Sequence, residues 1–235
     1  MKAVILAGGR GERLRPLTDK KPKPLITVKN RAILEYVIEY LKSHGIRDLI
    51  ITIGYRGEQI KMYLGDGKKF GVKIEYSVEK KPLGTAGCLI PLKNKLKDTF
   101  ILIGGDNLTK LDLRKFIDFH RKKKGILTAA LFEFEQKLQW GIYSLNEDKS
   151  IRDFTEKPVF TYTAGTMIFC LEPEIFKHIP DNPDKVINLT DHIMPDLVRK
   201  GEKIYGFEFR EMWEDIGSHE DYERINCMED HFFKF

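Results

Sequence analysis

The chain opens with a short apolar run that passes directly into a glycine-rich loop, and this junction constrains the fold more than any other part of the sequence. Residues 3–6 are aliphatic, and Gly8, Gly9 and Gly11 follow at once. Such a run is typical of a buried strand that feeds a loop. Because an open α/β sheet holds its ligand at loops of this kind, the sequence predicts an α/β fold with a binding site here.

Strands and helices alternate along the chain as far as residue 134. Strands are predicted at residues 2–6, 48–53, 72–78, 100–103 and 127–134, and helices at residues 31–44, 58–64, 86–92 and 112–124. Regular alternation of this type predicts a doubly wound, mostly parallel sheet.

The pattern changes after residue 134. Three closely spaced strands, predicted at residues 141–145, 151–156 and 163–170, indicate a small antiparallel lobe beside the main sheet. No linker rich in Gly, Ser or Pro divides the chain, so we predict a single domain over residues 1–235 with two parts, about 1–134 and about 135–235. The apolar tail at residues 231–235 indicates either packing onto the body or a homodimer contact.

Charge is distributed unevenly along the chain. The net charge is +5, but residues 1–31 carry nine Lys and Arg against Glu12 and Asp19. These cations are interleaved with Gly and Pro, without the aromatic platforms of a single-strand nucleic-acid binder or the amphipathic helix of a membrane anchor. A small polyphosphate is therefore favoured as the ligand over nucleic acid or a membrane surface.

The cysteines and the first apolar run indicate the cellular compartment of the protein. Cys88, Cys170 and Cys227 are too widely spaced for a disulfide framework or a zinc knuckle, so we expect buried thiols. The first apolar run is too short for a signal sequence or a membrane span. We therefore expect a cytoplasmic protein.

The opening loop has the chemistry of a phosphate site. It is neither a P-loop nor a dinucleotide fingerprint, because Leu14 stands where the last Gly of the fingerprint would be. Glycines nevertheless let backbone N–H groups approach an anion, and Arg13 adds a forked donor suited to phosphate. Further on, two prolines hold the segment around Lys23 extended. These features favour a triphosphate site over the alternative, a flexible surface loop with a solvated lysine.

Several ordered motifs resemble those of the sugar-1-phosphate nucleotidylyltransferases, the NDP-sugar pyrophosphorylases. The resemblance is nearest to catalytic domains of the mannose-1-phosphate guanylyltransferase and glucose-1-phosphate thymidylyltransferase type. The matching segments span the chain: 6–18 (LAGGxGxRLxPLT), 22–25 (PKPL), 82–87 (PLGTAG), 105–106 (GD), 140–141 (WG), 154–158 (FTEKP), 164–165 (AG) and 213–217 (WEDIG).

The resemblance implies a Rossmann-like core, without the left-handed β-helix domain that longer members append, and transfer of a nucleotidyl group to a sugar 1-phosphate with release of pyrophosphate. It implies catalytic roles for Arg13, Lys23 and Asp106, and Mg²⁺ as the cofactor with Asp106 and Asp215 as its ligands, an ion that prefers oxygen. The implied nucleotide-binding residues are Leu6, Gly8, Gly9, Gly11, Arg13, Glu79, Pro82, Gly84 and Thr85. The implied sugar-phosphate residues are Gly141, Glu156, Lys157, Thr163 and Gly165.

Some positions depart from the family pattern. Thr163 stands where many members have Asn, which leaves sugar recognition at that point open. Glu12 and Ser218-His219 are further departures, and none of the three removes an expected phosphate or metal contact.

Glu79 bears on the choice of base. Members that use thymidine or uridine nucleotides often carry Gln here, whereas a carboxylate only accepts hydrogen bonds and suits the paired N1–H and 2-amino donors of guanine. GTP with mannose 1-phosphate is therefore expected. One alternative is a salt bridge from Glu79 to Lys80, Lys81 or another lysine, which would leave the choice of base to backbone groups. The alternative functions are a glucose-1-phosphate thymidylyl- or uridylyltransferase and a regulatory module that binds a nucleotide sugar without turnover.

Overall fold

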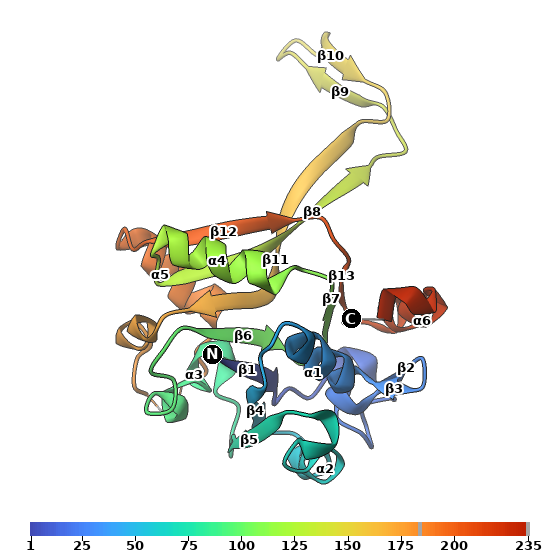
Figure 1. Ribbon diagram of the computed structural model, residues 1–235. Coiled ribbons are helices and arrows are strands. Elements are labelled where there is room, and N and C mark those ends of the chain that lie inside the picture. Colours follow the sequence, from blue (N-terminus) through green and yellow to red (C-terminus); the bar gives the residue numbers. More distant parts are fainter. Residues whose placement is uncertain (183–184, 234–235) are drawn as a thin grey trace.

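A seven-stranded sheet runs through the centre of the molecule, with strand order β12-β8-β11-β6-β1-β4-β5 (Figure 1). The computed structural model describes residues 1–182 and 185–233. The strands of this sheet are β1 (Lys2–Ala7), β4 (Asp48–Ile53), β5 (Lys73–Val78), β6 (Phe100–Gly104), β8 (Leu127–Lys137), β11 (Val159–Leu171) and β12 (Ile204–Phe209). Four neighbouring pairs are parallel, and β11 is antiparallel to both β6 and β8. The predicted mostly parallel α/β sheet is confirmed.

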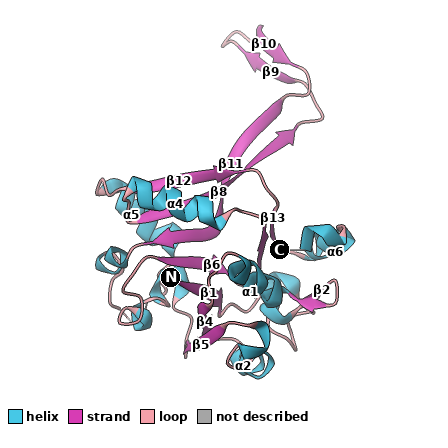
Figure 2. Ribbon diagram, in the orientation of Figure 1, coloured by secondary structure: helices cyan, strands magenta, loops and turns pink. Residues whose placement is uncertain are grey.

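Helices cover both faces of the sheet (Figure 2). On one face a core cluster joins β1 to α1 (Ile33–Ser43), α2 (Gly57–Leu64) and α4 (Leu113–Lys123). On the other face a second cluster joins the sheet to α3 (Gly84–Gly87), to a π-helical turn (Leu189–Ile193) and to α5 (Met194–Arg199), which continues that turn. Central strands that are buried on both faces are continuous apolar runs, and this pattern predicts β1, β4 and β6 from the sequence.

Smaller elements complete the fold beside α1. Two short antiparallel pairs are formed by β2 (Thr27–Val28) with β3 (Arg31–Ala32), and by β7 (Asn107–Thr109) with β13 (Trp213–Asp215). The last helix, α6 (His219–Cys227), begins at Ser218, whose side chain and that of Asp221 form a capping box.

The antiparallel lobe differs from its prediction. Residues 163–170 belong to β11, which lies inside the main sheet between β6 and β8 rather than beside it. The residues from Ile168 to Leu171 are fully buried against β6, and this burial draws the strand into the core. Only β9 (Ile142–Leu145) and β10 (Ile151–Thr155) form a separate hairpin, which projects from the body at the end of β8 and β11 (Figure 1).

Two further expectations concerned the C-terminal tail and the cysteines. The Phe233 ring packs on Tyr36 with 5.3 Å between centroids, so the tail contacts the body there, while residues 234–235 lie outside the described residues. Cys88 and Cys170 are buried as predicted. Cys227 is exposed, because α6 turns Ile225 rather than Cys227 toward the core. No helix in the described parts of the chain is long and apolar enough to span a membrane.

Candidate active site

A pocket of about 710 Å³ opens at the carboxyl ends of β1 and β6. Eight of the residues predicted from the sequence line it: Leu6, Gly8, Gly9, Gly11, Arg13, Lys23, Thr85 and Asp106. They come from segments far apart in the chain, which meet because parallel strands end at one edge of the sheet. Met167, with a φ of +55°, forms another part of the wall.

The opening loop is held in a compact conformation by its own contacts. Gly11 has a φ of +62°, and a Cβ there would lie 3.0 Å from both the Lys23 Cβ and the Thr18 Cγ2. The Thr18 hydroxyl donates to the Gly11 carbonyl at 2.9 Å. Only glycine fits this position without strain, and its fit brings the loop against Lys23.

Two carboxylates converge on one ammonium group at the edge of the pocket. The Lys23 Nζ contacts Asp106 Oδ2 closely and lies 3.5 Å from Asp215 Oδ1. Burial raises the pKa of Asp215, and the neighbouring Asp106 carboxylate raises it further. A point that faces two carboxylates suits a cation, and the pair fits Mg²⁺ completed by phosphate oxygens and water.

A hydrogen-bond relay orients Asp106. The Trp213 indole Nε1 donates to Asn107 Oδ1 at 2.8 Å, and Asn107 Nδ2 donates to Asp106 Oδ1 at 3.1 Å. Pairing of β7 with β13 sets Asn107 opposite Asp215 and thereby brings the two carboxylates together. The sequence reasoning missed Asn107 as a site residue, and its only signal was its place beside Asp106 at the end of an apolar strand.

The opening loop also contacts the turn that follows β13. A Cβ on Gly217 would lie 3.2 Å from each terminal nitrogen of Arg13, so the guanidinium packs flat against this turn. His219, one of the departures from the family pattern, has its Nε2 2.6 Å from the Arg15 carbonyl oxygen. The substitution therefore provides a second tie between the loop and the turn.

A smaller cavity of about 260 Å³ adjoins the first and shares its glycine loop. The predicted residues Glu79, Pro82 and Gly84 line it, together with Thr52, Cys88 and Val186. Glu79 Oε2 accepts from the Leu83 amide at 3.2 Å, and a Cβ on Gly8 would lie 2.6 Å from Glu79 Oε1. Burial raises the pKa of the Glu79 carboxyl.

Thr52 was not predicted from the sequence. Its hydroxyl is buried, and within the described residues it has no hydrogen-bond partner. It lies in the apolar run of β4, where nothing in the periodicity marks a cavity wall. A buried hydroxyl without a partner in the wall of a cavity is a group that a bound ligand can satisfy.

The segment from Pro82 to Gly87 is fixed against the chain near Ile187. Gly84 has a φ of +80°, and a Cβ there would lie 2.5 Å from the Ile187 carbonyl oxygen. The Ala86 amide donates to that oxygen at 2.9 Å, and the Leu189 amide donates to the Thr85 hydroxyl at 2.8 Å. Glycine at this position allows the close approach that shapes the smaller cavity.

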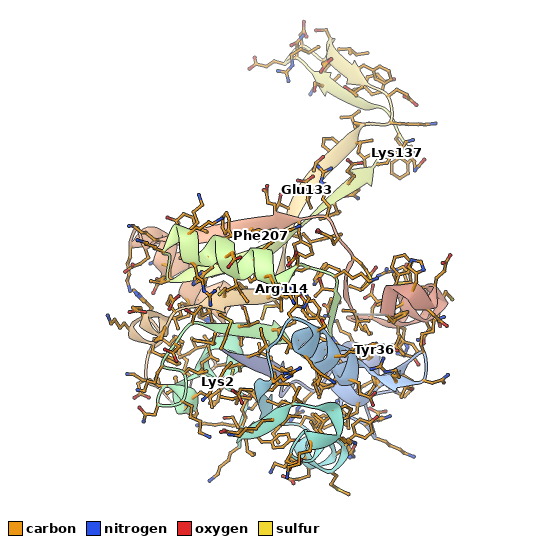
Figure 3. All side chains as sticks on the ribbon, in the orientation of Figure 1. Lys2, Tyr36, Arg114, Glu133, Lys137 and Phe207 are labelled. Atoms are coloured by element: carbon orange, nitrogen blue, oxygen red, sulfur yellow. The ribbon has the colours of Figure 1, made fainter. Side chains whose placement is uncertain are left out.

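The predicted sugar-phosphate residues are not brought to either cavity. Gly141, Glu156 and Lys157 lie on the projecting hairpin or at its base, where a Cβ on Gly141 would be 2.8 Å from Glu156 Oε2. Thr163 and Gly165 lie on β11, opposite Glu133 and Leu131. Figure 3 shows Glu133 and Lys137 on the ribbon that leads away from the body.

Comparisons with known proteins identify the family of the chain. Residues 2–230 match the family model described as nucleotidyl transferase. The chain is 33% identical to a UTP–glucose-1-phosphate uridylyltransferase of Synechocystis, over 94% of this chain and 61% of that protein. It is 32% identical to a mannose-1-phosphate guanylyltransferase of Mycobacterium tuberculosis, over 94% of this chain and 62% of that protein.

The chain thus spans about three fifths of the length of these two relatives. Among solved structures, HddC from Yersinia pseudotuberculosis superposes with a TM-score of 0.76 over 96% of this chain and 97% of that one, at 24% identity, which shows the shared fold. A family match over nearly the whole length decides the assignment. The chain belongs to the nucleotidyl transferase family.

Proposed function

We propose that this chain transfers a nucleotidyl group from an NTP to a sugar 1-phosphate, and that GTP and mannose 1-phosphate are its substrates. The observation that carries the proposal is a pair of adjoining cavities on one glycine loop. The larger holds the cations and carboxylates that phosphate chemistry needs, and the smaller has the size and lining for a base.

The reaction needs positioning more than proton transfer. A phosphate monoester has a second pKa of about 6, so the sugar phosphate is mostly dianionic at neutral pH and can attack unaided. Its oxygen forms a bond to the α-phosphorus of the NTP, the α–β phosphoanhydride bond breaks, and pyrophosphate leaves with the electron pair. Arg13, Lys23 and the loop amides hold the triphosphate and offset the charge that gathers on the leaving group.

Mg²⁺ fits the pair formed by Asp106 and Asp215. Both carboxylates face one cationic point, which Lys23 marks in this structure. These two residues would hold the ion, with phosphate oxygens and water completing its shell. When bound, Mg²⁺ would neutralise the charge of the triphosphate and polarise its phosphorus.

Guanine is the base that Glu79 favours. Its carboxylate lines the smaller cavity and, among the described residues, forms no salt bridge with a lysine or arginine, which argues against the alternative role. A carboxylate can accept from the adjacent N1–H and 2-amino groups of guanine, whereas the O4 of uracil would face it repulsively. Mannose 1-phosphate follows from the guanine assignment and from the likeness to guanylyltransferases.

A matrix of GTP, ATP, UTP and dTTP against mannose and glucose 1-phosphates, with pyrophosphate measured, tests the proposal. We expect pyrophosphate release that requires a sugar 1-phosphate and is fastest with GTP and mannose 1-phosphate. A glucose-specific reaction with UTP or dTTP would correct the substrates. Binding of nucleotide sugar without turnover in any combination would instead make the chain a regulatory module.

The metal assignment has its own test. Asp106→Ala and Asp215→Ala should each lower turnover by orders of magnitude, because each removes a ligand from the ion that offsets transition-state charge. Asp118→Ala is the control, since this carboxylate lies on the exposed side of α4. Near-normal turnover of either folded site variant would remove that residue from the metal site.

A further inference from the structure

One short segment of the chain contacts both ends of the opening loop, residues 8–20. It consists of the residues that follow β4 and of the first turn of α2, and we call residues 54–59 the bracket. At the start of the loop, the Tyr55 amide donates to the Gly8 carbonyl oxygen at 3.2 Å. A Cβ on Gly54 would lie 2.9 Å from that same oxygen, so a side chain there would push the two segments apart. The bracket is therefore packed directly against the first residue of the loop.

Three side chains of the bracket bind the other end of the loop. They donate to the successive carbonyl oxygens of residues 18–20: Tyr55 Oη at 3.2 Å, Arg56 Nη2 at 2.6 Å and Gln59 Nε2 at 3.1 Å. Arg56 Nε also donates to Tyr55 Oη at 2.9 Å, which leaves the proton of that hydroxyl for the loop. One guanidinium thus supports two of the three contacts.

The loop supplies a carbonyl oxygen to each of these hydrogen bonds. In the described part of the chain, the amides from Gly9 to Arg13 donate no hydrogen bond, and the same residues line the larger pocket. Successive backbone N–H groups at the wall of a pocket can bind an anion. The groups that would receive a triphosphate are therefore separate from those that fix the loop.

Arg56 adopts an unusual backbone conformation where it makes these contacts. Its φ is +52° and its ψ is +28°, in the left-handed region that favours glycine or asparagine. It also stands at the N-cap of α2, where short polar side chains are preferred, and its own side chain forms no capping bond. Neither the backbone nor the helix end accounts for an arginine at this position. The hydrogen bonds to Tyr55 and to the loop account for it.

We propose that Arg56, supported by Tyr55 and Gln59, is a positioning residue that holds the opening loop in the conformation that receives a triphosphate. The inference rests on the proposed function for the nature of the ligand. Arg56 does not line the larger pocket, so it acts on the ligand through the loop. A loop that is ordered in advance loses less conformational freedom when the ligand binds, and the affinity for the triphosphate is higher for this reason.

Limited trypsin digestion measures the order of the loop without ligand or turnover. The loop carries its own cleavage sites at Arg10, Arg13 and Lys20, which the protease reaches when the backbone opens. In Arg56→Gly these sites should be cut about tenfold faster than in wild type, because contacts that close the loop are lost. The site at Lys97, exposed before β6, should be cut at the same rate in both chains. Equal rates at the loop sites would overturn the proposal.

The choice of variants separates positioning from loss of the fold. Glycine adopts a φ of +52° without strain, so Arg56→Gly should keep the backbone of the bracket. Tyr55→Phe and Gln59→Met each remove a donor without a change of charge, and Met keeps the helix because it is a strong helix former. All three variants should unfold at the temperature of wild type and loosen the loop. An effect confined to Arg56→Gly would trace it to charge and would overturn the role of the bracket.

Lys124→Gly is the matched control. Lys124 has a φ of +53° at the exposed C-cap of α4, so this variant makes the same backbone change and removes the same charge outside the bracket. Cleavage of the loop should stay at the wild-type rate. Faster cleavage equal to that of Arg56→Gly would show that the bracket contacts are not its cause, and the proposal would fail.

Inorganic tripolyphosphate tests the link to the ligand and needs no choice of base. With Mg²⁺ it should protect the loop from trypsin, and the concentration for half-protection should rise about tenfold in Arg56→Gly. The same variant should raise KM for the NTP by a similar factor, while KM for the sugar 1-phosphate stays unchanged. No protection of wild type, or protection at equal concentrations in both chains, would overturn the inference.

The outcomes separate this inference from the proposed function. An active wild type whose bracket variants keep both KM values contradicts the positioning role alone. A chain that turns over no NTP, yet whose loop tripolyphosphate protects less well in the bracket variants, supports the positioning role and contradicts the proposed function alone.

Discussion

Asn107 shows how much a carboxylate depends on its neighbour. It is buried, accepts from the Trp213 indole and donates to Asp106, so its amide fixes the direction of that carboxylate. We predict that Asn107→Ala raises the Mg²⁺ concentration needed for half-maximal turnover by about 10- to 100-fold, a typical cost of losing such a supporting contact.

A Mg²⁺ titration of pyrophosphate release measures this effect. Asn94→Ala is the matched control, because among the described residues the exposed Asn94 side chain is hydrogen-bonded only to Lys97. A folded Asn107→Ala with an unchanged Mg²⁺ requirement would show that Asp106 is oriented without it. Rescue by high Mg²⁺ separates loss of orientation from loss of the fold.

A second prediction for a single residue concerns Glu79, which we expect to determine the preferred base. Glu79→Gln replaces a group that only accepts with one that also donates, which matches the O4 acceptor and N3–H donor of uracil and thymine. Preference should shift from GTP toward UTP or dTTP by roughly tenfold or more, since a good bidentate pair is worth about 1–3 kcal/mol.

Ratios of kcat/KM for the three nucleotides measure the shift. Glu58→Gln serves as the control, because this side chain is exposed on α2 and, within the part of the chain that the structure describes, forms an ion pair only with Lys61. An unchanged ratio in Glu79→Gln would assign base choice to the backbone of the cavity.

At the level of elements, α4 is capped at its first turn and fixed to the sheet near its last turn. Asp112 caps its first turn by accepting from the amides of Arg114 and Lys115 at 3.0 and 3.2 Å. Near its last turn, His120 Nδ1 lies 2.7 Å from the Thr128 hydroxyl of β8, and Nε2 lies 3.1 Å from Glu172, just beyond β11. One imidazole thus ties a helix to two strands.

His120 should make stability depend on pH. Burial lowers its pKa below the ordinary 6.5, although Glu172 opposes this effect. As the pH falls, the unfolded chain therefore takes up the proton first. The stability linked to His120 is complete above 6.5 and is lost as the pH falls through the folded pKa.

Urea unfolding at about pH 8 and about pH 5.5, on either side of the ordinary histidine pKa, measures this dependence. Wild type should lose more free energy of unfolding between the two values than His120→Gln does. His44→Gln, at the partly buried C-cap of α1, provides the comparison. Equal losses in wild type and His120→Gln would exclude His120 as the source.

At the scale of the whole molecule, ligand binding should appear as stability. GTP with Mg²⁺ at about 100 times its dissociation constant should add roughly 2.7 kcal/mol, because it binds the folded state alone. For a chain of this size that corresponds to a rise in Tm of about 5–10 °C. In Asp106→Asn the part of the rise that depends on Mg²⁺ should vanish. A full rise in that variant would place the ion elsewhere.

Much of the fold could be predicted because its signals are local. The buried strands β1, β4 and β6 are apolar runs, and the glycine loop and Asp106 follow the carboxyl ends of β1 and β6, so their meeting at one edge could be predicted. Thr85 was placed at the site only by the family resemblance. Thr52 could not be found, because a single hydroxyl in a buried strand leaves the periodicity unchanged. Cys227 depended on how α6 rotates, which three-dimensional packing alone decides.

The projecting β9–β10 hairpin shows another limit of prediction from sequence. The alternation in residues 141–156 predicts strands, and strands are present. Alternation does not specify whether the hairpin lies over the sheet or projects from it, because an apolar face can be satisfied by the same chain or by another. The alternation therefore could not predict where Glu156 and Lys157 lie relative to the pocket.

Because Trp213 donates a hydrogen bond to Asn107, the fluorescence of this tryptophan should report on the site. Indole fluorescence responds to the polarity and hydrogen bonding around its N–H, and here that N–H is one amide away from Asp106. The chain has two tryptophans, and the other, Trp140, is 72% exposed just before β9. In Trp140→Phe, all tryptophan emission would come from beside the carboxylates. Binding of a cation could then be followed through the fluorescence of Trp213 alone, with no substrate present.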